Sequence, residues 1–233
     1  MRRTRLWGTA VATFVVLALP FIGGGGPGLI TLARADSIPA VPTSSVIRLT
    51  TADLASGTVD RRRAAAAAGD SCPSFVPGFP TDAVGDTTSP LGVGGTAQDD
   101  LVTFAIAFNE IRVANCLEPI PWRNFTWDSC MEQRLFWMAE DPSTDPASAW
   151  GHMGSVRSDG VPSVGCDGNL AGGPANTGAT VALKWWNSEK HRISLYRPDA
   201  NSSGACIGFA MSHGGIPNES PDFTRAAARW YDC

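Results

Sequence analysis

Histidine is the side chain best suited to proton transfer near neutral pH, and this chain has only three, His152, His191 and His213. His152 and His191 are the candidates for a general base or for two ligands of a divalent cation. The structural alternative is that His191 lies at a helix end and that His152 donates to a backbone carbonyl in a loop. His213 precedes Gly214 and Gly215, and we expect it in an exposed loop.

Two other segments resemble chemical motifs without meeting their requirements. Gly204–Gly208 has the spacing of a nucleophile elbow with Cys206 in place of serine, but a polar loop precedes it where the elbow needs a strand. Asp141-x-Ser143-x-Asp145 has calcium-loop spacing, but Pro146 stands where that loop needs glycine. The sequence also contains neither H-E-x-x-H nor G-x-S-x-G.

Cysteine usage and the N-terminus both indicate export. Arg2, Arg3 and Arg5 precede an apolar run over residues 6–22, and Ala33-Arg34-Ala35 is typical of a signal-peptidase site. We expect residues 1–35 to be a cleaved signal peptide, because Pro20 and four glycines make the run too short for a retained anchor. Six cysteines in an exported chain predict three disulfides. They are Cys72, Cys116, Cys130, Cys166, Cys206 and Cys233.

The charge of the mature chain restricts its partners. Removing the four arginines of residues 1–35 from the 18 basic residues leaves 14, against 22 acidic ones. A chain this acidic is repelled by phosphate backbones and by anionic lipid headgroups, so we expect no nucleic-acid partner and no binding to anionic membrane surfaces. No segment after residue 35 is apolar and long enough to span a bilayer, so we expect no integral membrane association after cleavage. Arginine in excess of lysine suggests a bacterial source.

Composition divides the mature chain in two. Residues 36–98 are rich in Ala, Thr, Ser, Pro and Gly and lack an apolar period, so we expect a disordered N-terminal tail, a low-complexity spacer. Arg61-Arg62-Arg63 and the alanines after it could form a short helix or a processing site. Cys72 suggests that this tail is pinned to the domain. Residues 99–233 contain all the tryptophans except Trp7 and are long enough for one core.

Apolar spacing predicts three helices and a strand in residues 99–233. The first helix begins at Asp99-Asp100, the second at Ser129 with Glu132 as a capping box, and the third at Thr177. A short apolar run over residues 206–211 predicts a buried strand. Adjacent helix positions point about 100° apart, so we expect Trp185 in the core and Trp186 as a candidate for ligand contact.

Five motifs in residues 99–233 resemble, in order and spacing, those of the CAP superfamily (cysteine-rich secretory proteins, antigen five, pathogenesis-related one). They are Asn109-x-x-Arg112 followed by Trp122; Gly151-His152-Met153; Asp167-Gly168-Asn169-Leu170-Ala171; Trp185-x-x-Ser188-x-x-His191-Arg192; and Ile207-Gly208-Phe209-Ala210.

This resemblance implies an α/β fold, a three-layer α/β/α sandwich with a surface cleft that in many members holds two His and two Glu. Here His152 stands at the first His, Gly168 and Ser188 stand at the two Glu, and Asp222 stands at the second His. We therefore expect no metal and no cofactor, with His152, His191 and Asp222 as weak metal candidates. The expected ligand cleft consists of His152, Asn169, Trp186, Ser188, His191 and Asp222.

Six cysteines allow fifteen disulfide pairings, and the positions of the expected elements favour one of them. Cys116–Cys130 would join the first helix to the second, and Cys166–Cys206 would tie the box loop to the strand. Cys72–Cys233, the remaining pair, would clamp the tail across the domain.

Two functions fit these observations. The first is a secreted, extracellular binding module that holds a small hydrophobic, lipid-like or cell-envelope ligand, or a protein partner. The second is a secreted metal- or His-dependent hydrolase of peptidase type with His152 as its base. The missing box glutamate favours the binding module.

Overall fold

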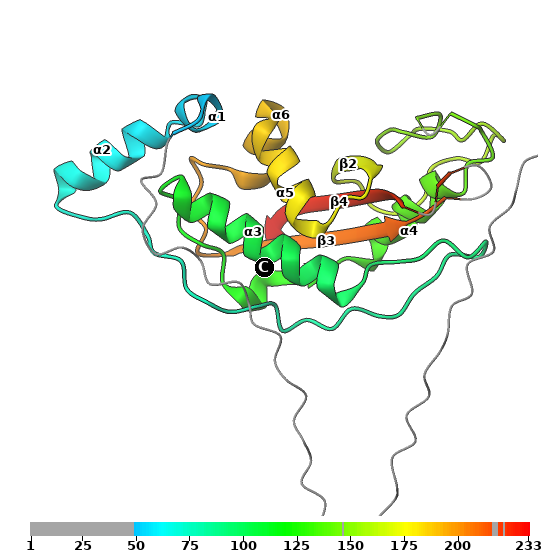
Figure 1. Cartoon of the computed structure of the whole chain (residues 1–233), viewed down its shortest axis with the longest axis horizontal. Helices are drawn as coiled ribbons and strands as arrows, with labels where there is room; N and C mark the ends of the chain where they lie inside the picture. The colour runs from blue at the N-terminus through cyan, green and yellow to red at the C-terminus, as the bar shows by residue number, and fades with distance from the viewer. Residues whose placement is uncertain (1–48, 146, 216–218, 221) are drawn as a thin grey trace, which may run out of the picture. The chain divides into compact units, whose positions relative to one another are not determined.

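Four strands form one mixed sheet in this computed structural model, which describes residues 49–145, 147–215, 219–220 and 222–233 (Figure 1). The strand order is β1-β3-β4-β2, with β1 parallel to β3 and the other neighbours antiparallel. The bounds are β1 Phe125–Trp127, β2 Asn169–Pro174, β3 Ala205–His213 and β4 Phe223–Asp232. The expected mixed α/β class is confirmed; the expected signal peptide lies outside the described residues.

Helices precede β1 and lie between β1 and β2 and between β2 and β3 along the chain. Their bounds are α1 Thr51–Ala55, α2 Thr58–Ala68, α3 Gln98–Ala114, η1 Trp122–Asn124, α4 Ser129–Ala139, α5 Gly178–Asn187, α6 Glu189–His191 and η2 Arg192–Tyr196, the last a π-helical turn. The three helices predicted in residues 99–233 are therefore confirmed as α3, α4 and α5. No helix in the described ranges is both long and apolar enough to cross a bilayer.

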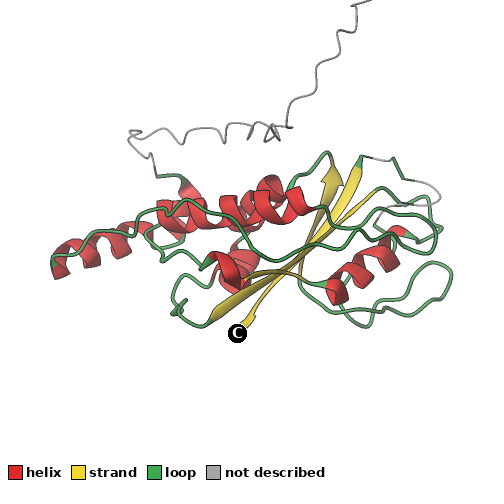
Figure 2. Ribbon diagram, turned by 90° about the horizontal axis from the view of Figure 1, so that it is seen from below, coloured by secondary structure: helices red, strands yellow, loops and turns green. Residues whose placement is uncertain are grey.

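Alternate residues of the strands belong to two different apolar clusters, and Figure 2 shows helices on both sides of the strands. Phe209 of β3 packs in the cluster of α3 and α5, where its ring stacks on Phe104 at 4.2 Å between centroids. Ala210 of β3 and Ala227 of β4 pack in the cluster of α4 with Met131. Because side chains alternate along a strand, α3 and α5 cover one face of the sheet and α4 covers the other.

The Asn109-x-x-Arg112 motif has a structural role. The Asn109 amide donates to the Ile120 carbonyl and accepts from the Ile120 N–H, both at 2.8 Å. Arg112 is buried and donates to the carbonyls of Glu118 and Tyr196, each at 2.6 Å. Burial lowers the pKa of Arg112 to about 10. The motif thus fixes the chain that leaves α3.

The segment before α3 folds against the domain over residues 49–98, where the composition predicts a flexible spacer. Thr87 and Thr96 donate to the buried Glu132 carboxylate of α4, each at 2.7 Å. Gly94 pairs with His213 of β3 through two backbone hydrogen bonds. These contacts correct the spacer prediction, because backbone pairing and buried polar contacts order a segment that has little apolar surface of its own.

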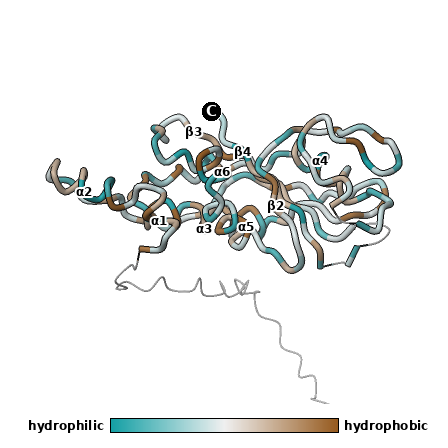
Figure 3. Tube along the Cα trace, turned by 90° about the horizontal axis from the view of Figure 1, so that it is seen from above, coloured by the Kyte–Doolittle hydropathy of each residue, from teal (hydrophilic) through white to brown (hydrophobic). Residues whose placement is uncertain are grey.

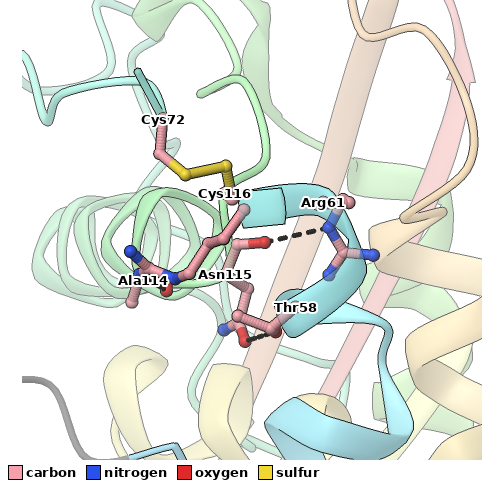
Figure 4. Close-up of a disulfide and its surroundings, with 7 residues drawn as sticks. Thr58, Arg61, Cys72, Ala114, Asn115 and Cys116 are labelled. Atoms are coloured by element: carbon pink, nitrogen blue, oxygen red, sulfur yellow. Dashed lines mark hydrogen bonds between the residues drawn. A yellow bond between two sulfur atoms is a disulfide. The ribbon is translucent and has the colours of Figure 1, made fainter. Parts of the chain in front are cut away.

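Helix α2 lies at one end of this segment and extends away from the sheet (Figures 1 and 3). Its arginines satisfy carbonyls at the C-terminal end of α3: Arg61 donates to Asn115 at 3.0 Å and Arg62 to Ala114 at 2.7 Å. Positive charge at this end also complements the helix dipole. The possible short helix at Arg61-Arg62-Arg63 is therefore confirmed, and Figure 4 shows how it meets the end of α3.

Three disulfides form, as expected, but the three predicted pairings are wrong. The bonds are Cys72–Cys116, Cys130–Cys166 and Cys206–Cys233, each between cysteines that follow one another along the chain. Disulfides of this kind are consistent with an oxidising compartment.

Each pairing has a local cause. Cys116 lies in a left-handed turn after α3, beside the returning N-terminal segment (Figure 4). The Cys166 N–H donates to the Cys130 carbonyl at 2.9 Å, because the loop after α4 turns back along that helix. Cys206 is the second residue of β3, at the end of the sheet where the antiparallel β4 stops one residue before Cys233. Cys72 does pin the N-terminal segment to the domain, but through Cys116.

Candidate functional site

One cleft of about 520 Å³ collects three of the expected ligand residues, His152, Asn169 and His191. They come from separate parts of the chain: the loop after α4, the start of β2, and the end of α6. Four further residues line this cleft: Asp167, Gly168, Lys190 and Ser194. The family resemblance implied a cleft position for Gly168, but the sequence did not single out the other three as cleft residues.

His152 is oriented by Asp167. Its Nδ1 lies 2.8 Å from Asp167 Oδ1, and the carboxylate also accepts from the N–H groups of Met153 and Gly168 at 3.2 and 2.9 Å. Burial of Asp167 raises its pKa, but the hydrogen bond from His152 and the two N–H groups outweigh burial and lower it. An ionised Asp167 requires the proton of His152 on Nδ1, which leaves Nε2 as a base.

His191 faces the same cleft from α6. Burial lowers its pKa, and the neighbouring His152 lowers it further. The imidazole is therefore mainly neutral at neutral pH. Lys190, which precedes it, supplies the cationic side chain among the cleft-lining residues.

Asn169 and Ser194 form the remaining wall. The Asn169 amide donates to the Ala228 carbonyl at 3.1 Å, while its oxygen accepts from the Ser194 hydroxyl at 2.5 Å. Ser194 also donates to the Lys190 carbonyl at 3.0 Å. This hydrogen bonding joins β4, β2 and η2, so the wall is held by elements distant in sequence.

Gly168 has little room for a side chain. A Cβ there would lie 2.8 Å from Met131 Sδ and 3.0 Å from the Ala228 carbonyl oxygen. A larger residue at this position would require the Met131 side chain and the backbone near Ala228 to shift.

Trp186 and Ser188 do not line the cleft. Trp186 is 3% exposed and packs edge-on against Tyr196 at 5.0 Å between ring centroids. Trp185 is fully buried, as expected, so both tryptophans belong to the core. The prediction for Trp186 was wrong because η2 folds back over the side of α5 that would otherwise face solvent. Ser188 links α5 to α6 through its backbone, accepting from the Arg192 N–H at 2.8 Å.

Asp222 lies far from the histidines. In the register of β2 with β4, Asn169 pairs with Ala228 and Pro174 pairs with Phe223. Asp222 is therefore six residues along the chain from Ala228, the partner of Asn169, a separation of roughly 20 Å. Asp222 is exposed and accepts a hydrogen bond from the Ser220 hydroxyl. The next residue, Phe223, lines a different, apolar pocket of about 320 Å³ together with Trp150. The expected ligand role of Asp222 is therefore corrected: the antiparallel return of β4 carries it to the other end of the sheet.

Metal ligation has limited support from these positions. Within the described residues, no three His, Cys, Asp or Glu side chains are grouped so that they could hold a metal ion. His152, His191 and Asp167 line one cleft, but the Asp167 oxygens already accept three hydrogen bonds. What the cleft offers chemically is an oriented base, hydrogen-bonding imidazoles and one ammonium group.

Asp167 is the main residue that sequence reasoning missed. Asp167 opens the Asp167-Gly168-Asn169 motif, so the sequence did indicate it, but the family resemblance implied a carboxylate at position 168 instead. Lys190 and Ser194 carried only a weak signal, four residues apart on a short helical segment. Comparison of this chain with protein-family models, with curated proteins and with solved structures found no match.

Proposed function

We propose that this chain is a secreted binding module of the CAP superfamily, which holds a small cell-envelope or lipid-like ligand in the cleft of His152 and His191. The order of the five sequence motifs supports the family, and apolar packing on both faces of the sheet agrees with a three-layer α/β/α sandwich. Three disulfides agree with an extracellular site of action.

The single observation that carries this proposal is the cleft itself. Its volume of about 520 Å³ is within the range of small-molecule sites, and hydrogen bonds to separate elements fix three of its polar side chains, Asp167, Asn169 and Ser194. Because these three side chains are already ordered, a ligand need not order them on binding, which favours affinity.

Blocking the cleft tests the proposal. Ser194→Phe places a large ring on the cleft wall, and Ile193→Phe is its matched control because Ile193 is exposed and does not line the cleft. We expect native mass spectrometry of the disulfide-intact protein, incubated with a bacterial envelope extract, to show a bound species. This species should persist in Ile193→Phe and be lost in Ser194→Phe. Equal binding by both variants, or none by the parent protein, contradicts the proposal.

A second candidate, a His-dependent hydrolase, is favoured by the hydrogen bond between His152 and Asp167, which leaves Nε2 available as a base. Against it, the Ser194 hydroxyl, which would be the nucleophile, has one proton and points it at the Asn169 oxygen at 2.5 Å, with the Lys190 and His191 carbonyls as longer contacts. Hydrolysis of ester and peptide substrates that falls about a hundredfold or more in Asp167→Asn would favour the enzyme.

A further inference from the structure

Three polar groups that line the cleft have no partner in the described part of the chain. The Lys190 ammonium, the His191 ring and Nε2 of His152 line the cleft without a hydrogen bond or an ion pair to any described residue. The other polar side chains of the cleft, Asp167, Asn169 and Ser194, are paired. The unpaired set contains a lysine ammonium, the His191 ring and an acceptor nitrogen on neutral His152, which suits a ligand that carries both acceptor oxygens and a hydroxyl.

The charge behind the cleft wall has the same sign. Arg134 of α4 is fully buried, donates to the His152 carbonyl at 3.4 Å, and interacts electrostatically with Asp167. Its Nε and Nη2 have no hydrogen-bond partner among the described residues. Burying a cation without a direct ion pair is costly, and a negative charge nearby offsets part of that cost.

The single carboxylate that lines the cleft is therefore already compensated. Asp167 accepts from His152 on one side and interacts with Arg134 on the other, so Lys190 is left without a matching anion in the cleft lining. The chain as a whole carries a formal charge of −4. A positive recess in an acidic protein selects for a compact anion that can enter it, rather than for a broad anionic surface.

We propose that the cleft binds a phosphate group, so that the ligand of the proposed binding module is phosphorylated. This inference rests on the proposed function and names its ligand class. Lys190 supplies the charge, as lysine does in many phosphate sites, and His191 supplies a ring N–H. Nε2 of neutral His152 accepts the P–OH of a monoester or hydrogenphosphate, and the protonated ring donates to a phosphate oxygen instead. A phosphate free in solution and a phosphate on a lipid headgroup present this same chemistry.

The probe is inorganic phosphate, titrated into the disulfide-intact protein and followed by amide chemical shifts in two-dimensional NMR. We expect saturable shifts in residues 167–169 and 190–194. Lys190→Gln should weaken binding by about tenfold or more, because it removes a charge-assisted contact. Arg63→Gln is the matched control, since it removes one positive charge at a largely exposed site on α2 and should leave the affinity unchanged.

A second variant guards against a folding defect in the first. His191→Gln keeps a hydrogen-bonding side chain but changes its reach, and it should also weaken phosphate binding while the unfolding temperature stays near that of the parent protein. Absence of saturable shifts, or equal affinities of Lys190→Gln and Arg63→Gln, would overturn the phosphate assignment.

Vesicles distinguish the two sources of phosphate. Competition by phosphatidylglycerol vesicles, but not by phosphatidylcholine vesicles, assigns an anionic lipid headgroup; phosphate binding without any vesicle competition assigns a soluble phosphate compound. If phosphate does not bind while an envelope species is still lost in Ser194→Phe, the binding module stands and only the ligand class fails.

Discussion

The carboxylate of Asp141 holds the loop that carries His152. Asp141 lies at the end of α4 and accepts hydrogen bonds from the hydroxyl and N–H of Ser158 and from the N–H of Ser143. Burial raises the pKa of Asp141, but the Ser158 hydroxyl and the other donors outweigh burial and lower it to about 2. One ionised side chain thus ties both ends of the segment between residues 141 and 158.

We predict that Asp141→Asn lowers the free energy of unfolding by about 1–3 kcal/mol at neutral pH, because the amide is a weaker acceptor than the carboxylate. The folded-state pKa lies below the unfolded value of 3.8, so this stabilisation is complete above about pH 4 and is lost as the pH falls toward 2. Urea denaturation at several pH values measures it. Asp145→Asn, at an exposed site, is the control and should have a smaller effect; equal effects would contradict the prediction.

At the scale of elements, His213 joins the end of β3 to the start of α3. Its Nε2 lies 2.7 Å from the carboxylate of Asp100, which also accepts from the Ala97 N–H that opens the helix. The expectation of a free exposed loop residue was therefore incorrect: His213 is half-buried and the last residue of β3. Its hydrogen bond with Asp100 raises the pKa of His213, and burial opposes this increase.

A raised folded-state pKa fixes the sign of the pH dependence. The protonated ring stabilises the fold fully below the unfolded value of 6.5, and this contribution is lost as the pH rises through the higher folded-state pKa. We predict that the free energy of unfolding of the parent protein declines from pH 6 to pH 9 more than that of His213→Gln. Parallel pH profiles for the two proteins would rule out this role of His213.

For the molecule as a whole, the Cys72–Cys116 bond closes residues 49–98 onto the domain. Its cysteines are 44 residues apart in sequence: Cys72 follows α2 and Cys116 follows α3 (Figure 4). The same segment is held farther along by Glu132 and by β3. Residues 49–98 are therefore attached to the domain by one disulfide and by several non-covalent contacts.

We predict that replacing Cys72 and Cys116 together by serine costs about 2–4 kcal/mol of unfolding free energy, because the unfolded chain gains freedom. Amide exchange should increase in residues 49–98 while the amides around Asp167 and Asn169 keep their protection. The control replaces Cys206 and Cys233, which join strands already paired by backbone hydrogen bonds. Faster amide exchange around the cleft in the variant without Cys72 and Cys116 would contradict this and would show that residues 49–98 also support the site.

Local patterns were sufficient to locate α3, α4 and α5 and the strand that begins near Cys206. These elements depend on apolar periodicity and capping, which are properties of neighbouring residues. One detail differed, since Asp128 rather than Ser129 caps α4 and Glu132 turns inward to the N-terminal segment. The sequence also supplied the two histidines and the asparagine that meet in the cleft.

Long-range packing set the features that these patterns missed. Disulfide pairing, the burial of Trp186, the distance of Asp222 from the histidines and the ordering of residues 49–98 all depend on how distant segments return to one another. The contact of Asp167 with His152 is of the same kind, because a loop of fifteen residues must close to form it. Such contacts arise from the sheet register and from shared burial, which a single sequence does not encode position by position.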